Sequence, residues 1–185
     1  MRHRDVALAL LVPMIALAGC STYAAARYVA SADTSQALRA YHGKATVAVG
    51  PFAAAVPNQR EMKCREKGHF TTPDGETFEE FVRQAFVSEL SKADLYAPGA
   101  PVTLTGRLLT LDFSQGVADA SWTLQFELRS SNLQWVTVLE RYPIAGGADP
   151  DACRQTARAL MPAVQNLLAK IVRHPGFPRL LSTTR

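Results

Sequence analysis

Residues 120–129 place the strongest constraint on the fold, because their side chains alternate between apolar and polar. Successive side chains of a strand point to opposite faces, so this run predicts a strand with one dry and one wet face. Such a strand is typical of an antiparallel sheet that is covered on one side only. The apolar members of the run are Ala120, Trp122, Leu124, Phe126 and Leu128.

Three further segments predict strands of the same sheet. The apolar run at residues 45–49 ends at a Gly-Pro pair and is typical of a central strand. Residues 102–113 alternate in two phases, which a bulge at Gly106-Arg107 would reconcile. After a polar turn, residues 134–142 predict a last strand, whose inward face the pattern leaves open.

Two segments predict helices. Thr77 and Glu80 form a capping box, so the first helix starts at residue 78 and carries an apolar stripe at steps of three and four. The second helix starts at Asp149-Pro150 and runs to about residue 173. Pro162 lies inside it and predicts a kink or break near Ala159.

The order of these elements is strand, helix, three strands, helix. We therefore expect an α+β fold, with a mainly antiparallel sheet of about four strands and two principal helices packed on one face. No apolar period supports a further element between residues 53 and 76, which we interpret as a long loop.

A secretion signal precedes this fold. A short basic head leads into an apolar run from Val6 to Ala18, which only Pro13 interrupts. This pattern is typical of a signal peptide. A membrane span needs about 20 apolar residues, so the run is too short for a permanent one.

Leu17-Ala18-Gly19-Cys20 resembles, at every position, the lipobox of bacterial lipoproteins. In that family the cysteine thiol receives a diacylglycerol, the peptide is cut before the cysteine, and the new amino group is acylated. The resemblance implies that Cys20 is the lipidation site. Ser21 replaces the aspartate that commonly retains such proteins at the inner membrane, which implies an outer-membrane anchor and a periplasm-facing domain. The alternative is an ordinary signal peptide in which Cys20 is incidental.

We accordingly expect a signal peptide at residues 1–19, a lipidated N-terminus and tether at residues 20–43, and one periplasmic domain at residues 44–185. The tether is rich in alanine and small polar residues, which predicts a partly helical spacer. The whole chain has a formal net charge of +4, and the signal peptide removes part of it. This small excess and the predicted export argue against a nucleic-acid partner.

The string VAVGPF at residues 47–52, with the element order, resembles the periplasmic lipoprotein domains of the curli-secretion and penicillin-binding-protein-activator type. It also resembles small auxiliary lipoproteins of envelope transport systems. The resemblance covers residues 44–173 and implies a shared fold, but no motif identifies a functional residue.

Cys64 and Cys153 remain once Cys20 is lipidated. An even pair of cysteines in an oxidising periplasm predicts a disulfide between them. Two buried free thiols are the alternative. A catalytic thiol is not supported, because no histidine and carboxylate pattern stands beside either cysteine.

The long loop contains a basic stretch that we regard as a candidate interaction loop. It could present cations to phosphate-bearing lipid, an anionic glycan or an acidic partner. Interleaved glutamates support the other interpretation, a solvated loop without a ligand. Its basic residues are Arg60, Lys63, Arg65 and Lys67.

The search for catalytic chemistry finds no GxSxG motif, no glycine-rich phosphate loop and no closely spaced pair of histidines. Cys64 and His69 lack the spacing of a zinc site. We therefore expect no catalytic residues, no metal and no cofactor other than the covalent lipid, and we do not expect an enzyme.

Two functions fit the sequence. The first is a lipid-anchored envelope lipoprotein that acts as a non-catalytic interaction or assembly accessory module, binding an envelope protein or copies of itself. The second is a carrier or sensor of an apolar or lipid ligand in a pocket between sheet and helices. Such a pocket would be lined by residues such as Trp122, Phe126 and Phe86.

Overall fold

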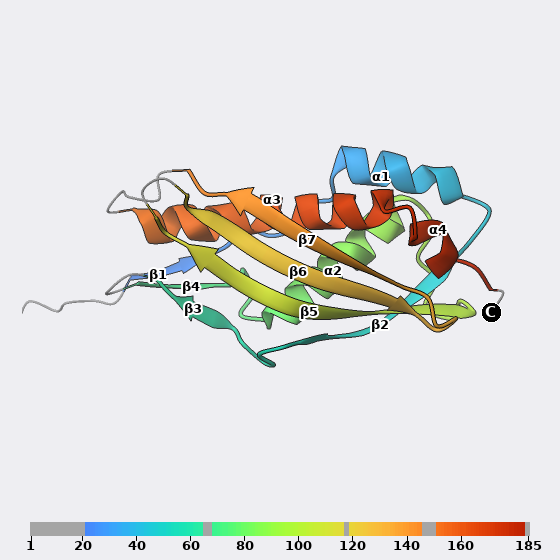
Figure 1. Cartoon of the computed structure of the whole chain (residues 1–185), viewed down its shortest axis with the longest axis horizontal. Coiled ribbons are helices and arrows are strands. Elements are labelled where there is room, and N and C mark those ends of the chain that lie inside the picture. The colour runs from blue at the N-terminus through green and yellow to red at the C-terminus, as the bar shows by residue number, and fades with distance from the viewer. Residues whose placement is uncertain (1–20, 65–67, 117–118, 146–150, 184–185) are drawn as a thin grey trace, which may run out of the picture.

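A computed structural model describes residues 21–64, 68–116, 119–145 and 151–183 and contains a four-stranded sheet with helices on one face (Figure 1). Its strands, in spatial order, are β2 (Val47–Ala54), β5 (Val102–Ser114), β6 (Ser121–Ser130) and β7 (Trp135–Pro143). β2 pairs in parallel with β5, and the other two pairings are antiparallel. The predicted α+β class and mainly antiparallel sheet are confirmed.

The two long helices are α2 (Phe78–Lys92) and α3 (Ala152–Arg173). α2 contacts β2 and β5, while α3 contacts β6 and β7. The short α1 (Ala32–Leu38) packs against both long helices, a single 3-10 turn follows it at Arg39–Tyr41, and α4 (Phe177–Leu180) comes after α3. Within the described ranges, no helix has the length and hydropathy that crossing a membrane requires.

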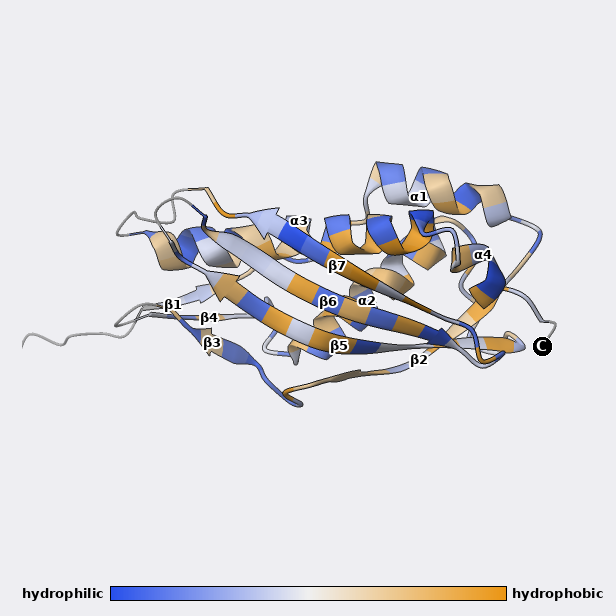
Figure 2. Ribbon diagram, in the orientation of Figure 1, coloured by the Kyte–Doolittle hydropathy of each residue, from blue (hydrophilic) through white to orange (hydrophobic). Residues whose placement is uncertain are grey.

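The core lies between the sheet and α2 and α3. On β6, the four large apolar side chains of the alternating run are at most 1% exposed, and the polar ones face outward. Figure 2 shows hydrophobic and hydrophilic residues alternating along this strand. On β7 the inward residues are Val136, Val138 and Glu140, which resolves the ambiguity of the sequence pattern.

The predicted bulge at Gly106-Arg107 is wrong in position. The register between β5 and β6 shifts between Leu108 and Thr110, and Gly106 stays in register opposite Leu128. A Cβ on Gly106 would lie 2.9 Å from two ring carbons of Phe52 and closer still to Phe126. The glycine is therefore required by the approach of two rings and not by a bulge.

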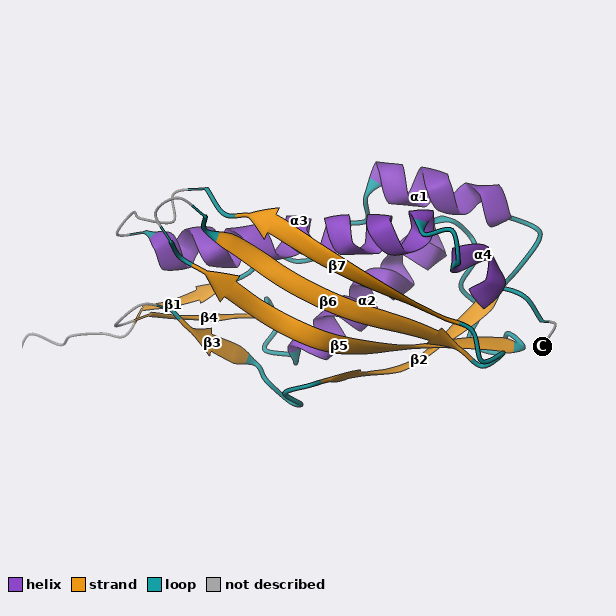
Figure 3. Ribbon diagram, viewed as in Figure 1, coloured by secondary structure: helices purple, strands orange, loops and turns teal. Residues whose placement is uncertain are grey.

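A second, smaller sheet shows that the long-loop interpretation of residues 53–76 is wrong (Figure 3). Its strands, in spatial order, are β1 (Ser21–Ala24), β4 (Gly68–Thr71) and β3 (Glu61–Lys63). β3 and β4 form an antiparallel hairpin, and β1 pairs in parallel with β4 along its whole length. Strands this short leave too few residues for a visible period of two.

Residues 21–43 are partly helical, as predicted, but they are not a free spacer, because this segment packs on the domain. Buried Glu89 of α2 accepts hydrogen bonds from the Tyr28 hydroxyl, from the Ser31 N–H at 2.7 Å and from the Ser35 hydroxyl at 3.1 Å. Leu38 is fully buried. The folded unit therefore begins at β1 and not at residue 44.

The two long helices match the predicted ones with specific differences. Thr77 caps α2 by accepting from the Glu80 N–H at 3.2 Å, as predicted. The Glu80 carboxylate pairs with Arg83 instead of closing the capping box, and these hydrogen bonds hold the pKa of Glu80 below its ordinary value.

α3 runs through Pro162 from Ala152 to Arg173, so of the predicted kink or break near Ala159 the break is wrong, and the kink stays a prediction. An interior proline costs about 3 kcal/mol, which the burial of apolar side chains on both sides of it offsets. The predicted start at Asp149-Pro150 lies outside the described residues.

Candidate interaction site

The turn between β6 and β7 presents apolar side chains to solvent on a closed backbone. The Ser130 N–H donates to the Gln134 carbonyl at 2.9 Å, and the Leu133 N–H donates to the Ser130 carbonyl at 3.0 Å. Leu133 has φ +72°, a left-handed conformation that is uncommon for a leucine. Its side chain is 73% exposed.

Buried polar side chains fix this turn to the chain around α4. The Ser130 hydroxyl donates to the Leu180 carbonyl at 2.8 Å. The Asn132 amide donates to the carbonyls of Arg179 at 2.8 Å and Ser182 at 2.7 Å, and Asn132 is only 6% exposed. The turn is therefore fixed on the side that faces α4, and the side chains on its other side are exposed to solvent.

A groove of about 540 Å³ lies along this turn and the adjoining β5 strand. Trp135 forms part of its wall and is 62% exposed. Trp135 lies across from Arg129, whose guanidinium pairs with Glu127 at 2.6 Å. We call this feature the turn groove; its lining residues are Thr103, Thr105, Arg129, Ser130, Ser131, Leu133, Gln134 and Trp135.

The turn groove has the chemistry of a binding surface. An exposed aromatic and an exposed aliphatic side chain stand on a rigid backbone, surrounded by hydroxyl groups and an arginine. Protein interfaces concentrate binding free energy in such apolar anchors within a polar rim. Holding them rigid lowers the entropy lost on binding. The left-handed leucine adds backbone strain, which persists at functional sites.

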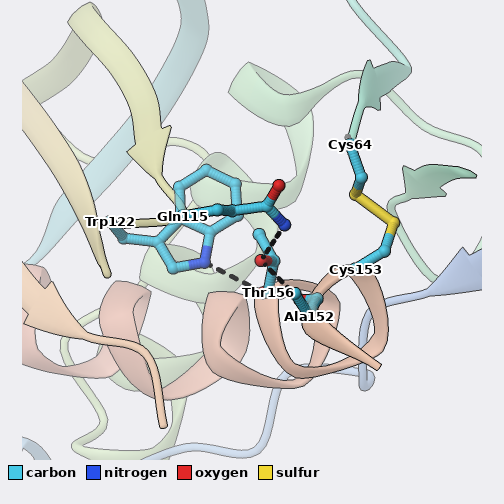
Figure 4. Close-up of a disulfide and its surroundings, with 6 residues drawn as sticks. All are labelled: Cys64, Gln115, Trp122, Ala152, Cys153 and Thr156. Carbon is cyan, nitrogen blue, oxygen red and sulfur yellow. Dashed lines mark hydrogen bonds between the residues drawn. A yellow bond between two sulfur atoms is a disulfide. The ribbon is translucent and has the colours of Figure 1, made fainter. Parts of the chain in front are cut away.

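The predicted disulfide is confirmed (Figure 4). Cys64 follows β3 and bonds to Cys153 in the first turn of α3, with a Cα–Cα distance of 5.5 Å. Close to it, the Trp122 indole donates to the Thr156 carbonyl at 2.9 Å. Cys20, the predicted lipidation site, lies outside the described residues.

The candidate interaction loop is only partly described. Arg60 is exposed and donates to the Gly75 carbonyl, while Lys63 is exposed at the end of β3. Arg65 and Lys67 lie outside the described residues. The loop's role as an interaction surface stays a prediction.

The residues suggested for an apolar ligand pocket are packed in the core. Trp122, Phe126 and Phe86 are at most 1% exposed. The Phe52 ring stands 5.3 Å from the Phe126 ring and 6.2 Å from the Phe86 ring, and the Trp122 ring stands 5.3 Å from the Phe70 ring. Neighbouring rings therefore fill the space beside these three residues.

Sequence reasoning missed the turn groove. Its signal was present in β7, where Trp135 and Leu139 share one parity and Val136 and Val138 share the other. A large aromatic residue that faces solvent indicates a binding surface. In β7 this could not be recognised from the sequence, because the pattern did not show which alternate residues face the core.

Comparison with solved structures shows that the fold also occurs in a protein of the family DUF330. A crystal structure of a Xanthomonas campestris protein of the family DUF330 aligns with 88% of this chain and 96% of its own, with TM-score 0.57 and 12% identity. A hypothetical protein of Chlamydia trachomatis aligns with 70% of this chain and 94% of its own, with TM-score 0.48 and 11% identity. No family model and no curated protein matches the sequence.

The described residues contain no group of three or more His, Cys, Asp or Glu side chains placed to hold a metal ion. The expectations that the chain has no metal, no cofactor and no catalytic residue stay predictions.

Proposed function

We propose that this chain is a lipid-anchored lipoprotein of the outer membrane that acts in the periplasm as an interaction or assembly accessory module, and that it binds a partner protein at the turn groove. One observation supports the interaction role. Leu133 and Trp135 are exposed on a turn that the buried Asn132 amide fixes to the chain around α4. The lipid anchor rests on the match of residues 17–20 to the lipobox.

The groove favours a protein partner. Its wall offers one aromatic ring, one leucine and threonine methyl groups, which complement an apolar side chain of another protein. The hydroxyl groups and Arg129 at its rim can hydrogen-bond to a backbone or to polar side chains.

A photo-crosslinking amino acid at position 135 tests the interaction role in growing cells. We expect a discrete ultraviolet-dependent adduct, either with another envelope protein or with a second copy of this chain. Arg141 supplies the matched control, because it is exposed on the same strand and the same face, toward the opposite end. Equal adducts from both positions, or none from position 135, would contradict the proposal.

The variant Leu133→Gly tests whether the Leu133 side chain contributes to partner binding without lowering the stability of the fold. Glycine adopts positive φ without strain, so the turn keeps its backbone while losing the apolar side chain. We expect unchanged or slightly higher stability and a weaker adduct from position 135. An undiminished adduct would exclude Leu133 from the binding surface.

A further inference from the structure

The residue that follows the predicted lipidation site is already part of a sheet. Ser21 is the first residue of β1 and lies opposite Gly68, and all four residues of β1 pair with β4. The Ala25 N–H extends the pairing by donating to the Thr71 carbonyl at 2.9 Å. A residue spans at most about 3.6 Å, so this leaves almost no slack between Cys20 and the folded domain.

The segment after β1 adds no slack either. It crosses to α2, where Tyr28, Ser31 and Ser35 donate to Glu89, and Leu38 is fully buried. The chain from residue 21 to residue 38 is therefore fixed to the domain at its start, middle and end.

β1 lies at one end of an elongated molecule. Figure 1 shows β1, the C-terminal end of β5 and the start of α3 at the left, with α4 and the β6–β7 turn at the right. We call the left end the β1 end; it includes the β3–β4 hairpin and the Cys64–Cys153 disulfide. Along β5, the distance from Phe113 near this end to Thr103 in the turn groove is about 34 Å, at roughly 3.4 Å per residue.

We infer that the β1 end rests directly on the membrane surface and that the domain holds the turn groove about 35 Å away from it, at roughly 3.4 Å per strand residue. This inference rests on the proposed lipid anchor, which fixes Cys20 in the bilayer. The partner is a lipid bilayer of any headgroup composition, because the acyl chains on Cys20 would insert into its hydrocarbon core.

The two tryptophans report on this orientation without added labels. The Trp122 ring meets the Phe70 ring edge to face, with centroids 5.3 Å apart, and Phe70 lies across from Tyr23. Tyr23 follows Cys20 by three residues, which span at most about 11 Å. Trp135 pairs with Arg129, about 24 Å farther along β6 than Trp122. Trp122 is therefore the donor near the membrane and Trp135 the remote one.

The test is energy transfer from tryptophan to a dansyl-labelled phosphatidylethanolamine in phosphatidylethanolamine and phosphatidylglycerol vesicles carrying the lipidated full chain. Lipidation is first verified by intact mass, so a missing lipid counts against the proposed function and not against the orientation. Trp135→Phe removes the exposed remote donor and leaves the core intact.

We expect the mean transfer efficiency of Trp135→Phe to be about twofold that of the unchanged protein, because a donor about 24 Å farther away contributes little. Inserting a ten-residue Gly-Ser spacer after Cys20 should abolish most of this transfer, since it adds about 17 Å of root-mean-square reach. Equal efficiency in the two proteins, or no effect of the spacer, would overturn the inference.

Discussion

At the residue scale, the missing side chain of Gly106 lets the rings of two neighbouring strands pack over its backbone. The rings of Phe52 on β2 and Phe126 on β6 both enter the space where a side chain at position 106 would begin. The two rings stand 5.3 Å apart and join the parallel pair to the antiparallel part of the sheet. Both rings are buried, so neither can turn toward solvent to make room.

Gly106→Ala should therefore lower the free energy of unfolding by about 1–3 kcal/mol through overpacking. Chemical denaturation monitored by circular dichroism measures this change. Gly99→Ala is the control, because a Cβ there meets no atom within 4 Å. A Gly106→Ala protein as stable as this control would show that the rings can repack.

Also at the residue scale, the hydrogen bond from Tyr28 to Glu89 holds the N-terminal segment. Burial, followed by the hydrogen bond and the charge of Glu89, raises the pKa of Tyr28 above its ordinary value. The folded state therefore keeps the phenol protonated at a pH where the unfolded chain ionises it. Its stabilisation is fully present below the unfolded pKa of about 10 and is lost as the pH rises above that value.

Tyr28→Phe should lower the free energy of unfolding at neutral pH by about 1–3 kcal/mol, because Glu89 loses one donor. The difference from the unchanged protein should shrink above about pH 10. Denaturation at a series of pH values measures both effects, and Tyr41→Phe, which keeps the ring contact with Phe177, serves as control. A difference that stays constant across the alkaline range would contradict this account.

At the element scale, the long periodic segments were predictable and the short ones were not. The strands at β5 and β6 and the start of α2 at Thr77 followed from alternation and capping, which are local properties. α1 buries Thr34 and Ser35 rather than an apolar stripe, so no hydrophobic period reveals it. β1 gains its partner from a strand far along the chain, which local reasoning cannot find.

The disulfide acts at the same scale by joining the β3–β4 hairpin to α3 across 89 residues of sequence. The chain-entropy model gives such a closure about 4–5 kcal/mol of stabilisation. We expect the double variant Cys64→Ser with Cys153→Ser to unfold at lower denaturant concentration by about this free energy. The two single variants are controls, because each leaves one unpaired cysteine thiol. A double variant as stable as the unchanged protein would contradict a stabilising role of the disulfide.

At the scale of the whole molecule, the N-terminal strand β1 and the turn groove lie at opposite ends of the fold. β1, the hairpin and the disulfide lie at one end, and the turn groove held by Asn132 lies at the other. The four-stranded sheet and the long helix α3 run between these two ends. If Cys20 carries the proposed lipid, a partner bound at the groove would stand clear of the membrane. The groove could not be predicted, because exposure of Trp135 depends on a parity that the pattern of residues 134–142 does not fix.

The central claim is that Cys20 carries the lipid that attaches this domain. The most direct measurement is the intact mass of the membrane-extracted protein, with Cys20→Ala for comparison. We predict a chain that begins at Cys20 and carries the added mass of a diacylglycerol and an acyl group. A chain without acyl mass, or a cleavage site elsewhere, would contradict the account.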